Sequence, residues 1–220
     1  MKIINYLNSI FFSGVLIMFG CNEPEKNADG NAIVHQLLNK EYVLITDRET
    51  LQGSDDEISN HVDSILSGLI DAEFISTGQK NFDLNSDNLS DIGFEIIDLN
   101  LFNPNGLPES FDSLAARVLP ISIQILDNST HGYPDALDDG EQIASTGNWT
   151  SGSGILGTFM NAGQFQGNGK KYLAIRFVNR NQFNYGWIKI YCSQHNDTLR
   201  IIDCAFNTIT ESPIFAGQTE

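Results

Sequence analysis

The chain has 220 residues, 41% of them apolar, and a formal net charge of -16. This length and apolar content suffice for one all-β domain or two small domains, and we expect one domain preceded by a leader. The strongly acidic balance argues against nucleic acid as a partner, because the phosphate backbone is recognised by basic surfaces.

The first twenty residues have the pattern of an export signal: Lys2, an apolar run interrupted by Asn and Ser, and a small residue before Cys21. A permanent span would need about 20 apolar residues without such interruptions. LIMFGC, residues 16–21, resembles a bacterial lipobox, although Met18 stands where Leu is usual. The resemblance implies that Cys21 is acylated and becomes the N-terminus, and the several acyl chains of such a cysteine anchor stably.

The acidic residues that follow Cys21 resemble a signal that sends some lipoproteins to the cell surface. We therefore expect a protein anchored in the outer membrane, on either its periplasmic or its outer surface. Residues 1–20 are predicted to be the signal peptide, residues 21–40 a polar tether, and residues 41–220 a β-sandwich domain. We expect this domain to be a monomer.

The chain has three cysteines, so assigning Cys21 to lipid leaves Cys192 and Cys204 as a candidate disulfide in an oxidising compartment. The two lie in apolar runs joined by a polar turn. A two-residue hairpin turn there would not place them opposite each other, so a bridge needs a longer loop or a bulge. The alternative is a pair of buried free thiols.

The pattern along the domain predicts one early strand, one short helix and then strands only. EYVLITD, residues 41–47, is the first strand, and residues 54–69 combine a capping box with one apolar helical face. Later runs rich in β-branched and aromatic residues predict an antiparallel, jelly-roll-like β-sandwich. The predicted strands are residues 93–102, 118–126, 157–165, 172–179, 185–192 and 198–207, with 145–157 as a loop.

In the predicted strands 172–179 and 185–192 the alternation of apolar and polar residues is partly blurred. Such a pattern is typical of strands that are covered on both faces.

FDLNSDNLSDIGFEI, residues 82–96, has the ligand rhythm of a calcium loop. Counted from Asp83, oxygen-bearing side chains stand at positions one, three, five and nine, with the Leu89 carbonyl at seven; the predicted ligands are Asp83, Asn85, Asp87, Leu89 and Asp91. A loop that wraps tightly can direct alternate residues to one ion, and Ca²⁺ takes six to eight oxygens.

Two features depart from a helix-flanked calcium site. Asn88 takes the place of the usual Gly at position six, and Asn tolerates positive φ. Phe94 stands at position twelve in place of an acid, and Glu95 would point the opposite way on a strand. We predict a weak structural calcium site completed by water or by another carboxylate such as Asp98; the alternative is a solvated turn whose side chains cap their own backbone.

A C-terminal stretch, residues 163–218, resembles a module of secreted bacterial proteins that often carry PEP-CTERM or type IX sorting tails. The matching pieces are Tyr172 to Phe177, Tyr185-Gly186-Trp187, Asp203 with Ala205, Pro213-Ile214 and Ala216-Gly217, and more loosely 82–96 and 136–143. The resemblance implies an extracellular β-domain and no particular reaction.

The sequence contains none of the common hydrolase or nucleotide-binding motifs, and its four histidines are scattered, so we expect no catalysis. We expect a role in surface binding or adhesion, to a glycan or to a surface protein. Tyr133, Trp149 and Tyr185 are candidates for stacking on sugar rings, which makes a carbohydrate-binding module the first alternative. A hydrolase with an unrecognised carboxylate site is the second.

Overall fold

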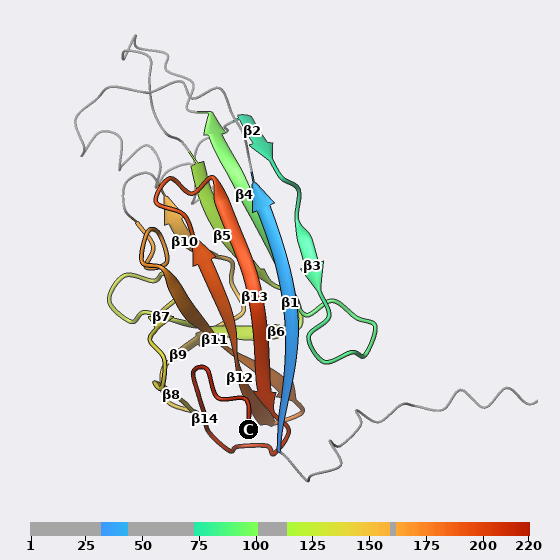
Figure 1. Cartoon of the computed structure of the whole chain (residues 1–220). Helices are drawn as coiled ribbons and strands as arrows, with labels where there is room; N and C mark the ends of the chain where they lie inside the picture. Colours follow the sequence, from blue (N-terminus) through green and yellow to red (C-terminus); the bar gives the residue numbers. More distant parts are fainter. Residues whose placement is uncertain (1–31, 44–72, 101–113, 159–161) are drawn as a thin grey trace, which may run out of the picture.

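A computed structural model of the chain describes residues 32–43, 73–100, 114–158 and 162–220, and every regular element in these ranges is a β-strand (Figure 1). The strands are β1 (Ile33–Val43), β2 (Glu73–Ser76), β3 (Lys80–Phe82), β4 (Ile92–Asn100), β5 (Leu114–Pro120), β6 (Ile123–Asp127), β7 (Ala136–Leu137), β8 (Gln142–Ile143), β9 (Asn148–Thr150), β10 (Gly154–Thr158), β11 (Lys170–Asn179), β12 (Gln182–Cys192), β13 (Thr198–Asn207) and β14 (Ile214–Phe215).

The strands form two large antiparallel sheets and one small one. The larger sheet has the order β1-β13-β12-β11-β6-β9, with β7 also paired to β11. The second has the order β10-β5-β4-β2, with β3 also paired to β4, and β8 pairs with β14 in the third. The two large sheets pack together, so the predicted all-β, antiparallel β-sandwich is confirmed.

The main apolar core lies between the two large sheets. One side is supplied by Phe94, Ile96 and Val118, and the other by alternate residues of the long strands, including Leu173, Ile175, Ile188, Ile190, Leu199 and Ile201. These side chains share a face because successive residues of a strand point to opposite sides. Phe94, Ile96 and Val118 are fully buried, which removes a large apolar area from water.

A second core covers the other face of the larger sheet. It contains the residues that alternate with the first set, among them Tyr172, Ala174, Tyr185, Trp187 and Ala205. Ile143 of β8 and Ile214 of β14 also belong to this core, so the small sheet covers part of that face. β11 and β12 are therefore buried on both faces, as their blurred alternation predicted.

The N-terminal boundary of the domain differs from the prediction. β1 begins at Ile33, which is buried, and pairs with β13 along its length, so residues 33–40 belong to the sandwich and not to the tether. The alternation is hidden in the sequence because the register shifts between Leu37 and Lys40, where Asn39 has a φ of +45°. A bulge of this kind breaks the period of two from which strands are predicted.

The remaining predicted elements have mixed outcomes. β4, β11, β12 and β13 match predicted strands closely, whereas the predicted loop 145–157 contains β9 and part of β10. The helix expected in residues 54–69, the signal peptide and Cys21 lie outside the described residues. In the part of the chain that the structure describes, no helix is long and apolar enough to cross a membrane.

Cys192 and Cys204 are free and both are buried in the main core. Cys192 pairs with Leu199 and Cys204 with Ile188, so the two thiols stand four residues apart along adjacent strands. That offset is roughly 13 Å, well beyond the Cα separation of about 7 Å that a disulfide can span. The candidate disulfide is therefore not formed, and the alternative of two buried thiols holds.

We predict that residues 27–220, which contain only Cys192 and Cys204, will show no reactive thiol when folded and two after unfolding in urea without reductant. Burial raises the pKa of both thiols to about 12, so almost no thiolate forms near neutral pH. Titration with a chromogenic disulfide reagent measures both counts. A count of zero in the unfolded protein would mean that the cysteines are bridged.

Candidate functional site

The predicted calcium loop connects β3 to β4, and it projects from the side of the sandwich (Figure 1). The Asp91 backbone N–H donates to the Phe82 carbonyl at 2.8 Å, which closes the loop at its base. Leu84 is 1% exposed and belongs to the main core. One apolar side chain thus anchors a loop whose other side chains are mainly polar.

Inside the loop, the oxygen-bearing side chains fold back onto the backbone. Asp83 accepts hydrogen bonds from the backbone N–H groups of Asp87 and Asn88, at 3.2 and 2.7 Å. Asn85 accepts from the Asp87 N–H at 3.0 Å, and Asp87 accepts from the Leu89 N–H at 2.8 Å. Such contacts are expected of a solvated turn whose side chains cap their own backbone, which was the alternative to a calcium site.

The loop curls tightly because two of its residues adopt the left-handed backbone region. The φ of Ser86 is +62° and that of Asn88 is +68°. The prediction that Asn88 replaces Gly at a positive φ is therefore confirmed. The Cβ of either residue crowds the backbone there, and Asn accepts this conformation more readily than Ser because its short amide side chain can hydrogen-bond locally.

Asp91 differs from the other loop acids because its side chain is buried, with 2% exposed. Its carboxylate accepts from the Leu84 N–H at 2.8 Å and from the Ser122 hydroxyl at 2.6 Å. Burial raises the pKa of Asp91, the two hydrogen bonds oppose that shift, and the charges of Asp87 and Asp83 raise it further. Asp83 and Asp87 therefore both lie close enough to Asp91 to repel its carboxylate.

Among the described residues, no Lys, Arg or His forms an ion pair with Asp83, Asp87 or Asp91. The same part of the chain also contains no group of three His, Cys, Asp or Glu side chains arranged to hold a metal ion. The loop therefore curls tightly, as a cation-binding loop does, and its carboxylates have no basic partner among the described residues. The same carboxylates, however, already accept hydrogen bonds from backbone N–H groups.

The residues at and near position twelve of the loop do not contribute a further ligand in the described structure. Phe94 is fully buried in the main core, and Glu95 accepts hydrogen bonds from Ser76 and from the partly exposed Arg117. Glu95 thus lies on the opposite side of β4 from Phe94, as its place on the strand predicted. Asp98 lies in β4, where its backbone stands opposite Ile75 of β2 and Leu114 of β5. Its side chain lies outside what the structure describes.

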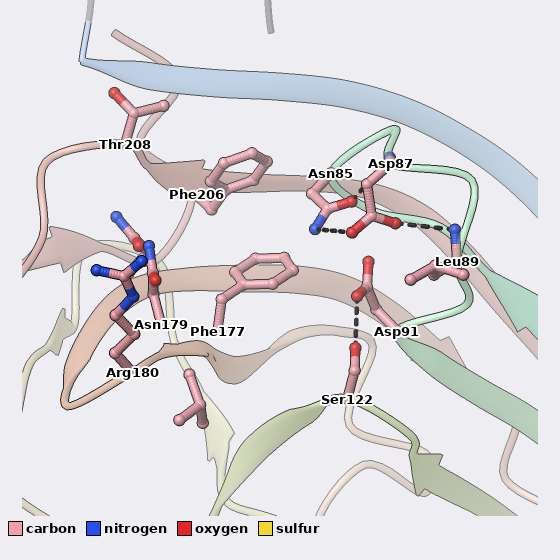
Figure 2. Close-up of a pocket in the computed structure, with 12 residues that line it drawn as sticks. Asn85, Asp87, Leu89, Asp91, Ser122, Phe177, Asn179, Arg180, Phe206 and Thr208 are labelled. Atoms are coloured by element: carbon pink, nitrogen blue, oxygen red, sulfur yellow. Dashed lines mark hydrogen bonds between the residues drawn. The ribbon is translucent and has the colours of Figure 1, made fainter. Parts of the chain in front are cut away.

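A groove of about 480 Å³ runs from the loop to the turn between β11 and β12. At one end are Asn85, Asp87, Leu89, Asp91 and Ser122; beyond them lie Phe177, Val178, Asn179, Arg180, Asn184, Phe206 and Thr208. Figure 2 shows the Asp91 carboxylate directed toward Asn85 and Asp87, with Phe177 and Phe206 between this end and Arg180. Four of the five predicted ligand residues therefore line one groove.

The groove residues outside the loop were not found from the sequence, because they come from strands far apart in the chain. The centroids of the Phe177 and Phe206 rings are 5.0 Å apart, and the rings are inclined by 59°. Gly186, opposite Phe206 in the sheet, allows this packing, since a Cβ there would lie 2.8 Å from the Phe206 Cβ. Gly186 belongs to the Tyr185-Gly186-Trp187 motif, so the sequence marked this position, but it did not indicate a groove.

The predicted stacking residues do not line the groove. Tyr185 is fully buried, and its hydroxyl donates to Glu211 at 3.2 Å, so its assignment as a ligand-stacking residue is wrong. It stands two residues from Trp187 and therefore lies on the same face of β12, which the second core covers. Trp149 is half-buried, with the Arg176 guanidinium 4.7 Å from its ring centroid, and Tyr133 is also half-buried.

Comparison with protein-family models, curated proteins and solved structures finds no match for this chain.

We predict that Ser86→Gly stabilises the protein by up to about 1 kcal/mol, because glycine adopts the φ of +62° without steric strain. Ser90→Gly, in the same loop but outside the left-handed region, is the matched control and should destabilise by about 0.5–1 kcal/mol. Urea unfolding measures both variants. Equal destabilisation by the two substitutions would contradict the strained turn.

Proposed function

We propose that the protein is an exported, lipid-anchored β-sandwich without catalytic activity, whose loop 83–91 binds Ca²⁺ and whose adjoining groove serves surface binding. The observation that carries the calcium assignment is the position of Asp83 and Asp87 close enough to Asp91 to repel its carboxylate, with no basic ion-pair partner for the three in the described residues. A divalent cation would relieve this repulsion, because opposite charge at close range favours the ionised carboxylates.

The hydrogen bonds within the loop are compatible with an ion. Each oxygen of an ionised carboxylate has two lone pairs, so accepting one N–H leaves capacity for a metal. Asp87 is exposed and Asp83 half-buried, so these side chains can turn without disturbing the core. We expect the loop to close on the ion, with a Kd on the order of 10⁻⁴ to 10⁻³ M, as is typical of extracellular modules.

The lipid anchor rests on the lipobox-like sequence that ends at Cys21. Because β1 begins at Ile33, residues 22–32 separate the acylated cysteine from the first strand. Eleven residues span at most about 40 Å, so the domain would stay near the bilayer. The resemblance to modules of secreted bacterial proteins supports an extracytoplasmic location.

A carbohydrate-binding module is the second candidate, favoured by the aromatic floor and amide-rich lining of the groove. A hydrolase receives less support. Glycoside hydrolysis uses two carboxylates that flank the scissile bond. Asp87 and Asp91 come from one loop and stand at the same end of the groove (Figure 2).

Calorimetric titration of Ca²⁺ tests the calcium assignment. The variant Asn85→Asp sharpens the test, because it should change the calcium affinity in a stated direction. The variant adds a fourth carboxylate to the loop, so we expect several-fold tighter Ca²⁺ binding and lower stability in EDTA, because an amide donor to Asp87 is also lost. Asp87→Asn should weaken binding at least tenfold.

Gln142→Glu, at an exposed position of β8, adds the same charge away from the loop and should leave the calcium affinity unchanged. A flat titration of the native protein, with Asn85→Asp only destabilised, would leave the self-capped turn as the correct interpretation.

Substitution of the lipobox cysteine tests the anchor. In the native host, the wild-type chain should fractionate with membranes and partition into detergent, whereas Cys21→Ser should lose its acyl chains and enter the soluble extract. Intact mass of the purified protein verifies the modification. An unacylated wild-type mass would exclude the anchor.

A further inference from the structure

We propose that the open side of the groove rests on the lipid bilayer that holds the anchor, and that four exposed aliphatic side chains around the groove enter the bilayer interface. This inference rests on the proposed anchor at Cys21 and names the surface that the groove contacts. It requires no ion in the loop. It follows from the places of the exposed aliphatic residues, the point where the chain enters the domain, and the charges beside them.

The exposed aliphatic residues gather around the groove. Six large apolar side chains of the described residues are strongly exposed: Leu37, Leu89, Ile121, Val178, Ile209 and Phe215. Leu89 and Val178 line the groove and are 67% and 46% exposed. Ile121 directly precedes the lining residue Ser122, and Ile209 directly follows the lining residue Thr208. Four of the six therefore border one site, whereas exposed apolar residues on a protein surface are usually scattered.

Backbone hydrogen bonds and strand pairing hold these side chains in place. The Ile121 N–H donates to the Asp91 carbonyl at 2.9 Å, which joins the turn between β5 and β6 to the loop that carries Leu89. The Ile209 N–H donates to the Asn207 side chain at 2.9 Å, and Val178 belongs to the paired strand β11. The fold itself therefore keeps these residues at the surface, where apolar area in contact with water is unfavourable unless a partner covers it.

The N-terminal part of the chain enters the domain at this same site. The Ala32 carbonyl accepts hydrogen bonds from the Thr208 N–H at 2.7 Å and from the Thr208 hydroxyl at 2.8 Å, and β1 begins at Ile33. Thr208 lines the groove, and Figure 2 shows the ribbon of β1 beginning beside it. A short tether from Cys21 would therefore hold this end of the groove nearest to the bilayer. A groove that begins at the tether can lie along the membrane, which brings Leu89 at its other end into contact as well.

The charges around the groove suit a zwitterionic membrane surface. Arg180 is exposed and lines the groove two residues from Val178. Its guanidinium can donate to a lipid phosphate while its stem covers apolar surface. Asp87 is exposed at the other end, and together with the net charge of -16 it opposes an anionic surface. Headgroups that carry both charges, such as phosphatidylcholine, accommodate Arg180 and Asp87 alike.

A bilayer fits this surface better than a second protein does. The four aliphatic residues come from four different segments and are separated by polar lining residues such as Asn179 and Asn184. A stable protein interface buries about 800 Å² on each side around a well-packed apolar centre. Membrane binding, in contrast, scales with the apolar area that enters a fluid interface, so separate side chains can each contribute.

The test uses the acylated full chain, purified from its host and reconstituted into phosphatidylcholine vesicles that contain lipids with a nitroxide quencher near the headgroup. A fluorophore is attached to Leu89→Cys or to Ile209→Cys. Labelling is selective because Cys192 and Cys204 are buried, while Cys21 carries lipid in the proposed anchor. We expect the vesicle lipids to quench the fluorescence at both positions about twofold or more, since both side chains enter the interface.

Phe215→Cys is the matched control. Phe215 is 45% exposed on β14 and does not line the groove, so a fluorophore at this position should not be quenched by the vesicle lipids. All three replaced side chains are exposed, so urea unfolding of the labelled variants should match that of the native chain.

The outcomes separate this inference from the anchor on which it rests. Equal quenching at all three positions, or none at Leu89→Cys and Ile209→Cys, would overturn the membrane contact and leave the anchor intact. A change in emission that appears without vesicles as the protein concentration rises would identify a second copy as the occupant. Quenching in vesicles of anionic lipid alone would overturn the zwitterionic surface. A chain that its host leaves unacylated refutes the anchor, and with it this inference.

Discussion

The candidate site depends on the buried residue Asp91. Its N–H donates to Phe82, its carbonyl accepts from the N–H groups of Ile121 and Ser122, and its carboxylate accepts from Leu84 N–H and the Ser122 hydroxyl. One residue therefore closes the loop and joins it to the connection between β5 and β6. Buried carboxylates are costly unless hydrogen-bonded, and this network meets that requirement. Because the same side chain borders the groove, a change in its ionisation affects the loop, the sandwich and the groove together.

The two-sided burial of β11 and β12 positions the other wall of the groove. Their residues alternate between the core shared with the second large sheet and the core under β8 and β14. The hairpin turn at Arg180 lies at one end of this pair of strands and is exposed. Packing on both faces restrains such strands, so the turn extends from a rigid support. Groups that recognise a ligand are most effective when held in this way.

Local patterns in the sequence predicted the parts of the fold that local physics decides. Runs rich in β-branched and aromatic residues indicated β4 and β11 to β13, and the Asn at position six of the loop indicated a positive φ, which Asn88 has. The start of β1 was missed because a bulge near Asn39 interrupts the alternation. The groove could not be predicted, since Asp91, Phe177 and Phe206 meet only after three distant segments pair. Tyr185 was misassigned even though its spacing from Trp187, which was expected in the core, placed both on the same face of β12.

The irregularity of β1 has a consequence for a chain confined to a membrane plane, as we propose for this one. Among the described strands β1 forms one border of the larger sheet, and its register shifts between Leu37 and Lys40. A straight border strand presents a regular row of backbone groups to which a neighbouring copy can add its own strand. The shift breaks that row and twists it locally. Molecules crowded on the same lipid surface would then meet repeatedly without their sheets merging into fibres, which keeps each one available as a separate unit.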